Sequence, residues 1–190
     1  MRLFLAAELP AAIKERVVEV HDELAGQLRG WRWVRPEGIH LTLRFLGEVE
    51  ESKDLAARSV WRDTVAAVSR FHLRVAGPGR FPERGAPRVL WLGVEETEPG
   101  GALAELAGAL ETVARQLGWA AETRGFHPHL TLARRARGAR PDDVPRRPPE
   151  AQAAGWVREV ILVRSRLGRD GASYTALDSF PLGERSRASK

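Results

Sequence analysis

His40-Leu41-Thr42-Leu43 and His129-Leu130-Thr131-Leu132 are identical tetrapeptides that stand 89 residues apart in a chain of 190 residues. Each lies in a segment whose apolar and polar residues alternate, which is typical of a β-strand. On a strand, the histidine and the threonine share one face and the two leucines share the other. We expect the leucines to pack against a helix and the polar pair to project from the opposite side of a sheet. Because a histidine and a threonine recur in the same register, the repeat indicates an internal duplication.

Amphipathic helices precede both strands of the repeat. Apolar residues recur at helical spacing from Ile13 to Leu28 and again from Leu103 to Leu117. If the two halves face each other about a pseudo-twofold axis, both histidines and both threonine hydroxyls converge in one cleft. The remaining pattern predicts a third helix over residues 52–69, strands over residues 3–7, 31–35, 39–47, 71–76, 88–94, 124–126, 129–134, 157–163 and 173–182, and one long loop over residues 135–154.

The composition is that of a globular protein and excludes several kinds of site. Hydrophobic residues make up 43% and charged residues 29%, and this length suits one domain or two small lobes that share a cleft. We assign residues 1–184 to a single bilobal domain and residues 185–190 to a polar, disordered tail. The absence of cysteine excludes disulfides, thiolate metal sites, iron–sulfur clusters and a cysteine nucleophile. The apolar start ends at Glu8, too early for a signal peptide, and no segment is long enough to span a membrane. A cytoplasmic monomer is therefore expected.

The repeated histidines favour acid–base chemistry at phosphorus. Imidazoles with ordinary pKa values near 6.5 can divide the roles of general acid and general base at neutral pH. Two threonine hydroxyls between them can donate hydrogen bonds to non-bridging phosphate oxygens. This set suits in-line displacement of an alkoxide without a metal, because protonation of the leaving oxygen replaces Lewis-acid assistance.

A metal site at His127-Pro128-His129 is the competing interpretation. However, the sequence has no His-x-x-x-His pair on a helix and no set of carboxylates beside the histidines. We therefore expect neither a metal nor a cofactor.

The paired tetrapeptides and their surroundings resemble the 2H phosphoesterase superfamily, and within it the RNA 2′,3′-cyclic phosphodiesterases, also called 2′-5′ RNA ligases. The matching segments are Arg2–Ala6, Ile39–Gly47, Phe81-Pro82, Val89–Val94 and Arg124–Arg134, with Ser165, Gly171 and Tyr174 near the end. The resemblance implies an α+β fold of two lobes, with two antiparallel sheets around a central cleft and helices on the outside. It also implies metal-independent hydrolysis of a ribose 2′,3′-cyclic phosphate to a 2′-phosphomonoester, with reverse 2′-5′ ligation as a second activity. The implied partners are RNA ends that carry this group, tRNA fragments among them.

The resemblance also implies roles for four residues. His40 is the proton donor to the 3′ oxygen and His129 the proton acceptor from water, while Thr42 and Thr131 hold phosphate oxygens. The symmetry of the sequence alone does not distinguish the two histidines.

Three further residues are candidates for substrate binding. Arg134 occupies the family's arginine position after the second tetrapeptide, but ideal alternation places it on the leucine face, so that a strand end or a bend is needed. Arg44 shares the face of His40 and is either a phosphate contact or a solvated charge. Phe126 either stacks on a base or packs in the core. The sequence predicts His21 to be a surface residue.

Arginine dominates the positive charge of the chain. Only three of the 30 basic residues are lysine, and the formal net charge is +5. Six arginines follow the second tetrapeptide, and they form either a flexible basic flap that holds an RNA backbone or a solvated loop: Arg134, Arg135, Arg137, Arg140, Arg146 and Arg147. Two alternative functions stay open, namely a non-enzymatic RNA-binding module and a phosphodiesterase for a small cyclic nucleotide or an ADP-ribose cyclic phosphate.

Overall fold

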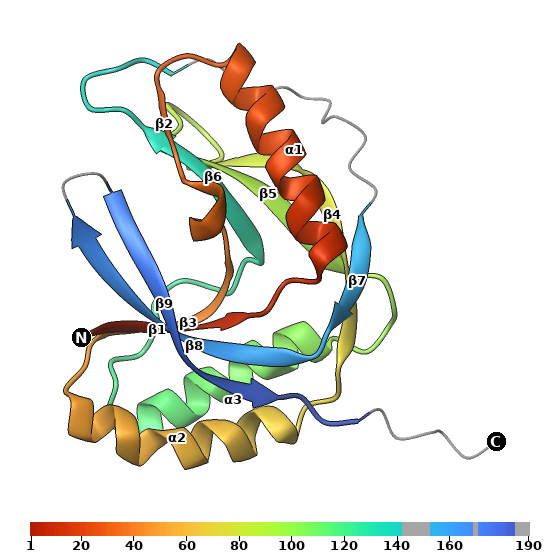
Figure 1. The fold of residues 1–190 in the computed structure, drawn as a ribbon, viewed down its shortest axis with the longest axis vertical. Coiled ribbons are helices and arrows are strands. Elements are labelled where there is room, and N and C mark those ends of the chain that lie inside the picture. Colours follow the sequence, from red (N-terminus) through yellow and green to blue (C-terminus); the bar gives the residue numbers. More distant parts are fainter. Residues whose placement is uncertain (142–152, 169–170, 185–190) are drawn as a thin grey trace.

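A curled antiparallel sheet with helices on both sides forms the fold (Figure 1). The computed structural model describes residues 1–141, 153–168 and 171–184. Within them the sheet has nine strands in the order β7-β4-β5-β6-β3-β1-β8-β9, and β2 also pairs with β6. The strands are β1 (Arg2–Ala7), β2 (Trp31–Trp33), β3 (Leu41–Glu48), β4 (Phe71–Phe81), β5 (Val89–Glu96), β6 (His129–Arg135), β7 (Ala154–Val157), β8 (Glu159–Gly168) and β9 (Gly171–Pro181). The helices are α1 (Ala11–Gln27), α2 (Glu51–Ala66) and α3 (Ala102–Gln116), with a 3-10 turn, η1, at Pro36–Gly38.

The two repeated strands, β3 and β6, meet in the middle of this sheet. Their register consists of one residue pair, Leu41 with Leu130. Among the described residues, the half that contains β3 has four strands, and the half that contains β6 has five, because β2 also pairs with β6. The predicted α+β fold with two antiparallel halves is confirmed, and the two predicted sheets are continuous with one another through this contact.

Each half of the sheet is covered by a helix that follows a strand of the other half. Helix α1 follows β1 but packs against β4 and β7, whereas α3 follows β5 but packs against β3. Helix α2 lies beside α3 and β9 on the same side of the molecule (Figure 1). This arrangement stabilises the packing of the two halves against each other, because α1 and α3 each bury their apolar stripe against the half that does not contain the strand before them. Leu28 caps the helix and is only partly buried, whereas the four positions of the predicted stripe within α1 are buried: Ile13, Val17, Val20 and Leu24.

Strand β4 is longer than the sequence predicted. It continues through Gly77-Pro78-Gly79, beyond the predicted end at residue 76, because a register shift between Val75 and Pro78 accommodates the proline within the pairing to β5. Gly79 lies flat against the ring of Trp91, where an added Cβ would stand 2.1 Å from the ring. The glycine therefore serves close packing rather than a turn.

The predicted strand over residues 157–163 is confirmed over residues 159–163, which belong to β8, but it is interrupted at Arg158. The chain forms two strands there, because β7 pairs with β4 in one half and β8 pairs with β1 in the other. The chain changes halves at Arg158, which separates the two strands. The predicted strand over residues 124–126 is absent, since residues 119–128 form neither helix nor strand.

Two other predictions fall mainly outside the described residues. Strand β6 ends at Arg135, and residues 136–141 continue as a loop, but most of the predicted loop over residues 135–154 and the tail over residues 185–190 are not described. None of the helices in the described part of the chain combines the length and apolarity that crossing a bilayer requires.

Candidate active site

The two tetrapeptides present their histidines and threonines to one shared cavity. Their leucines are buried in the main core, as predicted. On the opposite face, His40, Thr42, His129 and Thr131 all line a cavity of about 70 Å³ at the junction of β3 and β6. The duplication therefore places two imidazoles and two hydroxyls around a space about the size of a small anionic group.

A bulge follows each threonine of the repeat. Adjacent residues of β1 pair with Thr42 and Arg44, so that Leu43 is an extra residue on β3. In the same way, the adjacent residues Leu90 and Trp91 of β5 pair with Ala133 and Thr131, so that Leu132 is an extra residue on β6. An extra residue reverses the alternation of every side chain beyond it. The two bulges occupy equivalent positions in the two halves, and both change which residues reach the cavity.

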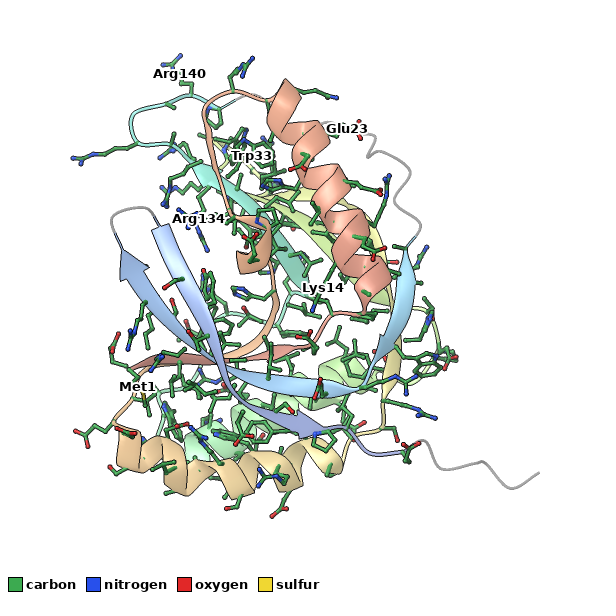
Figure 2. The ribbon with its side chains drawn as sticks, viewed as in Figure 1. Met1, Lys14, Glu23, Trp33, Arg134 and Arg140 are labelled. Carbon is green, nitrogen blue, oxygen red and sulfur yellow. The ribbon has the colours of Figure 1, made fainter. Side chains whose placement is uncertain are left out.

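The bulge at Leu132 brings Arg134 to the cavity side. Ala133 is fully buried, and Arg134 beyond it is exposed on the face of His129, where it lines the pockets around both histidines. Figure 2 shows Arg134 between β6 and the β8–β9 hairpin. The bend that the sequence required for Arg134 is thus a β-bulge.

The bulge at Leu43 turns Arg44 toward the opposite, leucine-bearing face. Its guanidinium Nε lies 2.6 Å from the Glu111 carboxylate on α3, and it donates to the carbonyls of Phe45 and Ala120. The side chain is 7% exposed, so the alternative of a solvated strand charge is wrong. Phe45 takes the cavity-side position instead. Arg44 borders a neighbouring pocket, and its role as a phosphate contact stays a prediction.

His129 is held in one tautomer by the backbone. Its Nδ1 lies 2.7 Å from the carbonyl oxygen of His127, and because a carbonyl only accepts, Nδ1 carries the hydrogen. The Nε2 atom is then the nitrogen with a free lone pair. The ring packs edge-on against Phe81 at a centroid distance of 5.1 Å. Burial lowers the pKa of His129, and the positive charges of His127, Arg134 and Arg124 lower it further, against the hydrogen bond to His127.

His40 lies in a more buried aromatic setting. Its ring stacks on Phe4 at a centroid distance of 4.5 Å and an interplanar angle of 29°, and Tyr174 meets it edge-on at 5.0 Å. Burial lowers the pKa of His40 to about 4, and the charges of Arg134 and His129 add to this, while a hydrogen bond to the backbone of Gly38 opposes it. Both histidines are consequently neutral at pH 7 in the free protein.

Some residues that shape the site were not predicted from the sequence to do so. Phe4 and Tyr174 form a small second cluster under His40 with Ala6 and Val163, separate from the main core. The signal for Phe4 was the uninterrupted apolar run of β1, which indicates a strand buried on both faces. Nothing in local periodicity marks Tyr174, because it reaches His40 from the far end of the chain.

The prediction that His21 is a surface residue is wrong. His21 is 7% exposed on α1, and its Nε2 lies 2.8 Å from the carbonyl oxygen of Val34. This contact fixes the segment between β2 and β3, which leads directly into His40. The apolar stripe of α1 is wide enough to include His21, whose other nitrogen is bonded to Asp22.

Two larger pockets open on either side of the central cavity. One, which we call the cationic pocket, has a volume of about 320 Å³ beside His40 and is lined by Arg2, Arg32, Arg35 and Arg134. The other, which we call the α3 pocket, has a volume of about 810 Å³ beside His129. Phe126 lines the α3 pocket and is 40% exposed, so it is available for stacking rather than buried in the core.

The arginines of the predicted basic flap are only partly described. Arg135, Arg137 and Arg140 are exposed, and Arg140 lies at the outer edge of the molecule (Figure 2). Arg146 and Arg147 fall outside the described residues. Within residues 1–141, 153–168 and 171–184, no three His, Asp or Glu side chains are grouped as a metal site.

Known proteins resemble this chain over most of its length. The profile of the 2′-5′ RNA ligase superfamily matches residues 10–169. The chain is 37% identical over 195 residues to the RNA 2′,3′-cyclic phosphodiesterase of Thermus thermophilus, a match that covers 98% of this chain and 93% of that protein. A crystal structure of a Thermus thermophilus protein superposes with a TM-score of 0.81 at 34% identity, over 97% of this chain and 100% of that chain. Escherichia coli LigT complexed with 3′-AMP superposes with a TM-score of 0.77 at 32% identity, over 95% of this chain and 97% of that chain.

Proposed function

This chain belongs to the 2′-5′ RNA ligase superfamily, and we propose that it is an RNA 2′,3′-cyclic phosphodiesterase that uses His40 and His129 as its acid–base pair. The observation that carries the proposal is the convergence of both histidines and both threonines on one cavity. The name of the Thermus thermophilus relative supports the choice of substrate. All four side chains come from one chain, so the proposal requires no second subunit.

The proposed reaction is an in-line displacement at phosphorus. A water oxygen attacks the cyclic phosphate, and its proton passes to one imidazole. The bond between phosphorus and the ribose 3′ oxygen breaks, and the other imidazole gives its proton to that oxygen. The product is a 2′-phosphomonoester with a free 3′ hydroxyl, and the two histidines exchange protonation states in each turnover.

The tautomer of His129 supports its role as the proton acceptor. Its Nδ1–H is occupied by the carbonyl of His127, which leaves the Nε2 lone pair available to water. The lowered pKa of His129 keeps this nitrogen unprotonated at neutral pH. A base in this state is ready before substrate binds.

The proton donor must acquire its proton when substrate binds. His40 is neutral in the free protein, because burial lowers its pKa to about 4. The cyclic phosphate carries a negative charge, and an opposite charge beside a histidine raises its pKa. Substrate binding therefore favours protonation of His40, so that the protonated form accumulates only in the complex.

The remaining cavity residues are proposed to hold the phosphate. Thr42 and Thr131 would donate hydrogen bonds to the non-bridging oxygens as negative charge builds there. Arg134 would neutralise part of that charge, since its guanidinium lies on the same face and acts electrostatically on both histidines. The imidazole proton takes the place of a metal at the leaving oxygen, so the proposed reaction is metal-independent.

Reverse 2′-5′ ligation follows from the same geometry. If a 5′ hydroxyl replaces water on the side of His129, the displacement joins two RNA ends through a 2′-5′ linkage. The α3 pocket supports this step, because its volume of about 810 Å³ beside His129 is large enough for a nucleoside.

Product mapping tests the proposal. A 5′-labelled oligonucleotide with a 2′,3′-cyclic phosphate end is incubated with the protein in EDTA, and the product is compared with synthetic 2′- and 3′-phosphate standards. We expect complete conversion to the 2′-phosphate. A 3′-phosphate product, hydrolysis only after a divalent metal is added, or no reaction would each contradict the proposal.

A further inference from the structure

The cationic pocket is built from four separate segments that each contribute one arginine. Arg2 comes from β1, Arg32 from β2, Arg35 from the residue before η1, and Arg134 from the far part of β6. The pocket also includes His40, so it opens directly onto the reacting centre. A cavity that gathers four guanidinium groups beside the proposed proton donor points to an anionic ligand.

Within the described residues, the one acidic strand partner of these arginines is Glu48, which pairs with Arg2 between β1 and β3 but does not line the cationic pocket. The residues that line the cationic pocket include neither aspartate nor glutamate. In the part of the chain that the structure describes, none of the four arginines has a carboxylate within the 4.0 Å that defines an ion pair. Arginines elsewhere on the surface are paired, as Arg74 is with Glu95 at 2.6 Å. A ligand is therefore expected to supply the compensating negative charge.

Two of the four arginines oppose each other directly. Arg32 and Arg134 are cross-strand partners in the pairing of β2 with β6, so their side chains leave the sheet on the same face. Like charges at directly opposed positions destabilise a strand pair. An anion bound between them converts this repulsion into attraction, and a phosphodiester suits planar guanidinium groups in particular.

The direction of the proposed displacement decides which part of the substrate reaches this pocket. His40 gives its proton to the 3′ oxygen, so the ribose that carries this oxygen lies on the side of His40. Water or a 5′ hydroxyl attacks from the opposite side, beside His129. The RNA strand continues from the 5′ carbon of that ribose, and its next phosphodiester leaves the cavity on the His40 side.

We infer that the cationic pocket binds the phosphodiester that precedes the terminal nucleotide, and that this contact is what favours an oligoribonucleotide end over a free nucleoside 2′,3′-cyclic phosphate. This inference rests on the proposed function and on the role of His40 within it. Arg32 and Arg35 are its specificity-determining residues. Arg134 is also proposed to contact the reacting phosphate, so a substitution there would not test this inference by itself.

Paired substrates of different length test the inference. Adenosine 2′,3′-cyclic phosphate has no preceding phosphodiester, whereas the dinucleotide adenylyl-adenosine 2′,3′-cyclic phosphate has one. We expect the dinucleotide to have a kcat/KM at least about tenfold higher, mainly through KM, because a charge-assisted hydrogen bond is worth that much. In the double variant Arg32→Gln/Arg35→Gln this advantage should disappear, while kcat/KM for the mononucleotide stays unchanged. Arg74→Gln, which removes a paired charge outside both pockets, should keep the advantage.

A binding measurement separates this inference from the proposed function. The affinity of the 2′-phosphorylated dinucleotide product is measured by fluorescence anisotropy over a range of salt concentrations. The double variant should bind about tenfold more weakly, with a salt slope shallower by roughly 0.7 for the phosphate contact that is lost. If neither substrate is hydrolysed but this difference in binding persists, the proposed function fails and the phosphate site stands.

Other results would overturn the inference. The pocket does not bind the strand if wild-type protein hydrolyses both substrates equally, or if the double variant loses activity on both to the same extent. A larger gain with an ADP-ribose cyclic phosphate than with the dinucleotide would assign the pocket to a small pyrophosphate ligand instead.

Discussion

The pocket beside His40 and the pocket beside His129 differ in charge and size, although the strands between them carry the same tetrapeptide. The cationic pocket has a volume of about 320 Å³, and its described lining includes four arginines and no acidic residue. The α3 pocket is larger, at about 810 Å³, and mixes arginines with Glu111, Glu122 and the exposed ring of Phe126. The repeated sequence therefore lines a central cavity with matching residues, while the two pockets beside that cavity differ.

The difference arises in the segments that enter the two repeated strands. Between α1 and β3 the chain forms β2 and η1, which bring Arg32 and Arg35 to the side of His40. The equivalent segment between α3 and β6, residues 119–128, forms neither helix nor strand and brings Phe126 to the side of His129. In the proposed function, the repeated strands carry the reacting residues, and the connections before them carry the residues that select the substrate.

The largest expected effect comes from removing either histidine. His40→Ala and His129→Ala should each lower kcat/KM for a cyclic phosphate by about 10²–10⁴-fold, because each is proposed to take part in proton transfer. His72→Ala is the matched control, since His72 is bonded to Thr97 outside both pockets. With bis(4-nitrophenyl) phosphate, whose leaving group needs no proton, only His129→Ala should stay impaired. Equal impairment of both variants on this substrate would mean that the two sides do not have separate roles.

Substitution of each threonine tests whether Thr42 and Thr131 contribute equally, as their matching positions in the repeat suggest. Thr42→Val and Thr131→Val keep the β-branched shape but lose the hydroxyl, and each should lower kcat by about 10–10²-fold. Thr→Ser at the same positions should restore most of the rate. A loss confined to one threonine would show that the phosphate lies nearer to one half than to the other.

Arg44 distinguishes a structural charge from a phosphate contact. Its buried pairing with Glu111 predicts that Arg44→Met lowers the free energy of unfolding by about 1–3 kcal/mol in urea titrations. The matched control is Arg62→Met, which breaks an exposed contact with Asp178 and should cost no more than about 1 kcal/mol. Unchanged stability with a reduced kcat/KM would instead make Arg44 part of the substrate site.

Arg134 lines both the cationic pocket and the α3 pocket, so its removal should change the pKa of both histidines. Its positive charge lowers the pKa of His40 and of His129, so Arg134→Gln should raise both values, and each ring then stays protonated to a higher pH. NMR titration of the histidine C2 protons measures this, with Arg74→Gln as the control. A shift in only one histidine would assign Arg134 to one side of the cavity.

The smallest effect is expected from the exposed arginines beyond β6. Arg137→Gln/Arg140→Gln should weaken binding of a longer RNA only slightly and make its salt slope shallower by less than the roughly 0.7 expected for one lost phosphate contact. The change should be smaller than that from Arg32→Gln/Arg35→Gln. An equal or larger change would favour a basic flap as the main RNA contact.

Much of the candidate site could be predicted from the sequence, because alternation and burial are local properties. The repeated tetrapeptide predicted two strands with buried leucines, and Leu41 and Leu130 are both fully buried. The stripes of α1 and α3 likewise predicted helices within a few residues of their observed bounds. The same local pattern failed for His21, whose place on the buried side of α1 depends on the carbonyl of Val34 from another segment.

Pairing between distant segments decided the rest. Periodicity continues across Arg158, so nothing local shows that β7 and β8 join different halves of the sheet. The bulges at Leu43 and Leu132 could not be predicted from local sequence either, since an extra residue is defined only by its pairing with the neighbouring strand. Arg44 and Arg134 are therefore placed by register, and their side chains lie opposite to what simple alternation predicts.

Local sequence was sufficient to select the residues proposed to react, two histidines and two threonines on strands with buried leucines, because side-chain alternation is a property of each strand alone. Three features instead required the folded chain: these groups share one cavity, Arg134 reaches it, and Arg32 opposes Arg134 across a strand pair. Strand register and the exchange of helices between the halves depend on contacts between segments far apart in the chain, and no single stretch of sequence encodes such contacts.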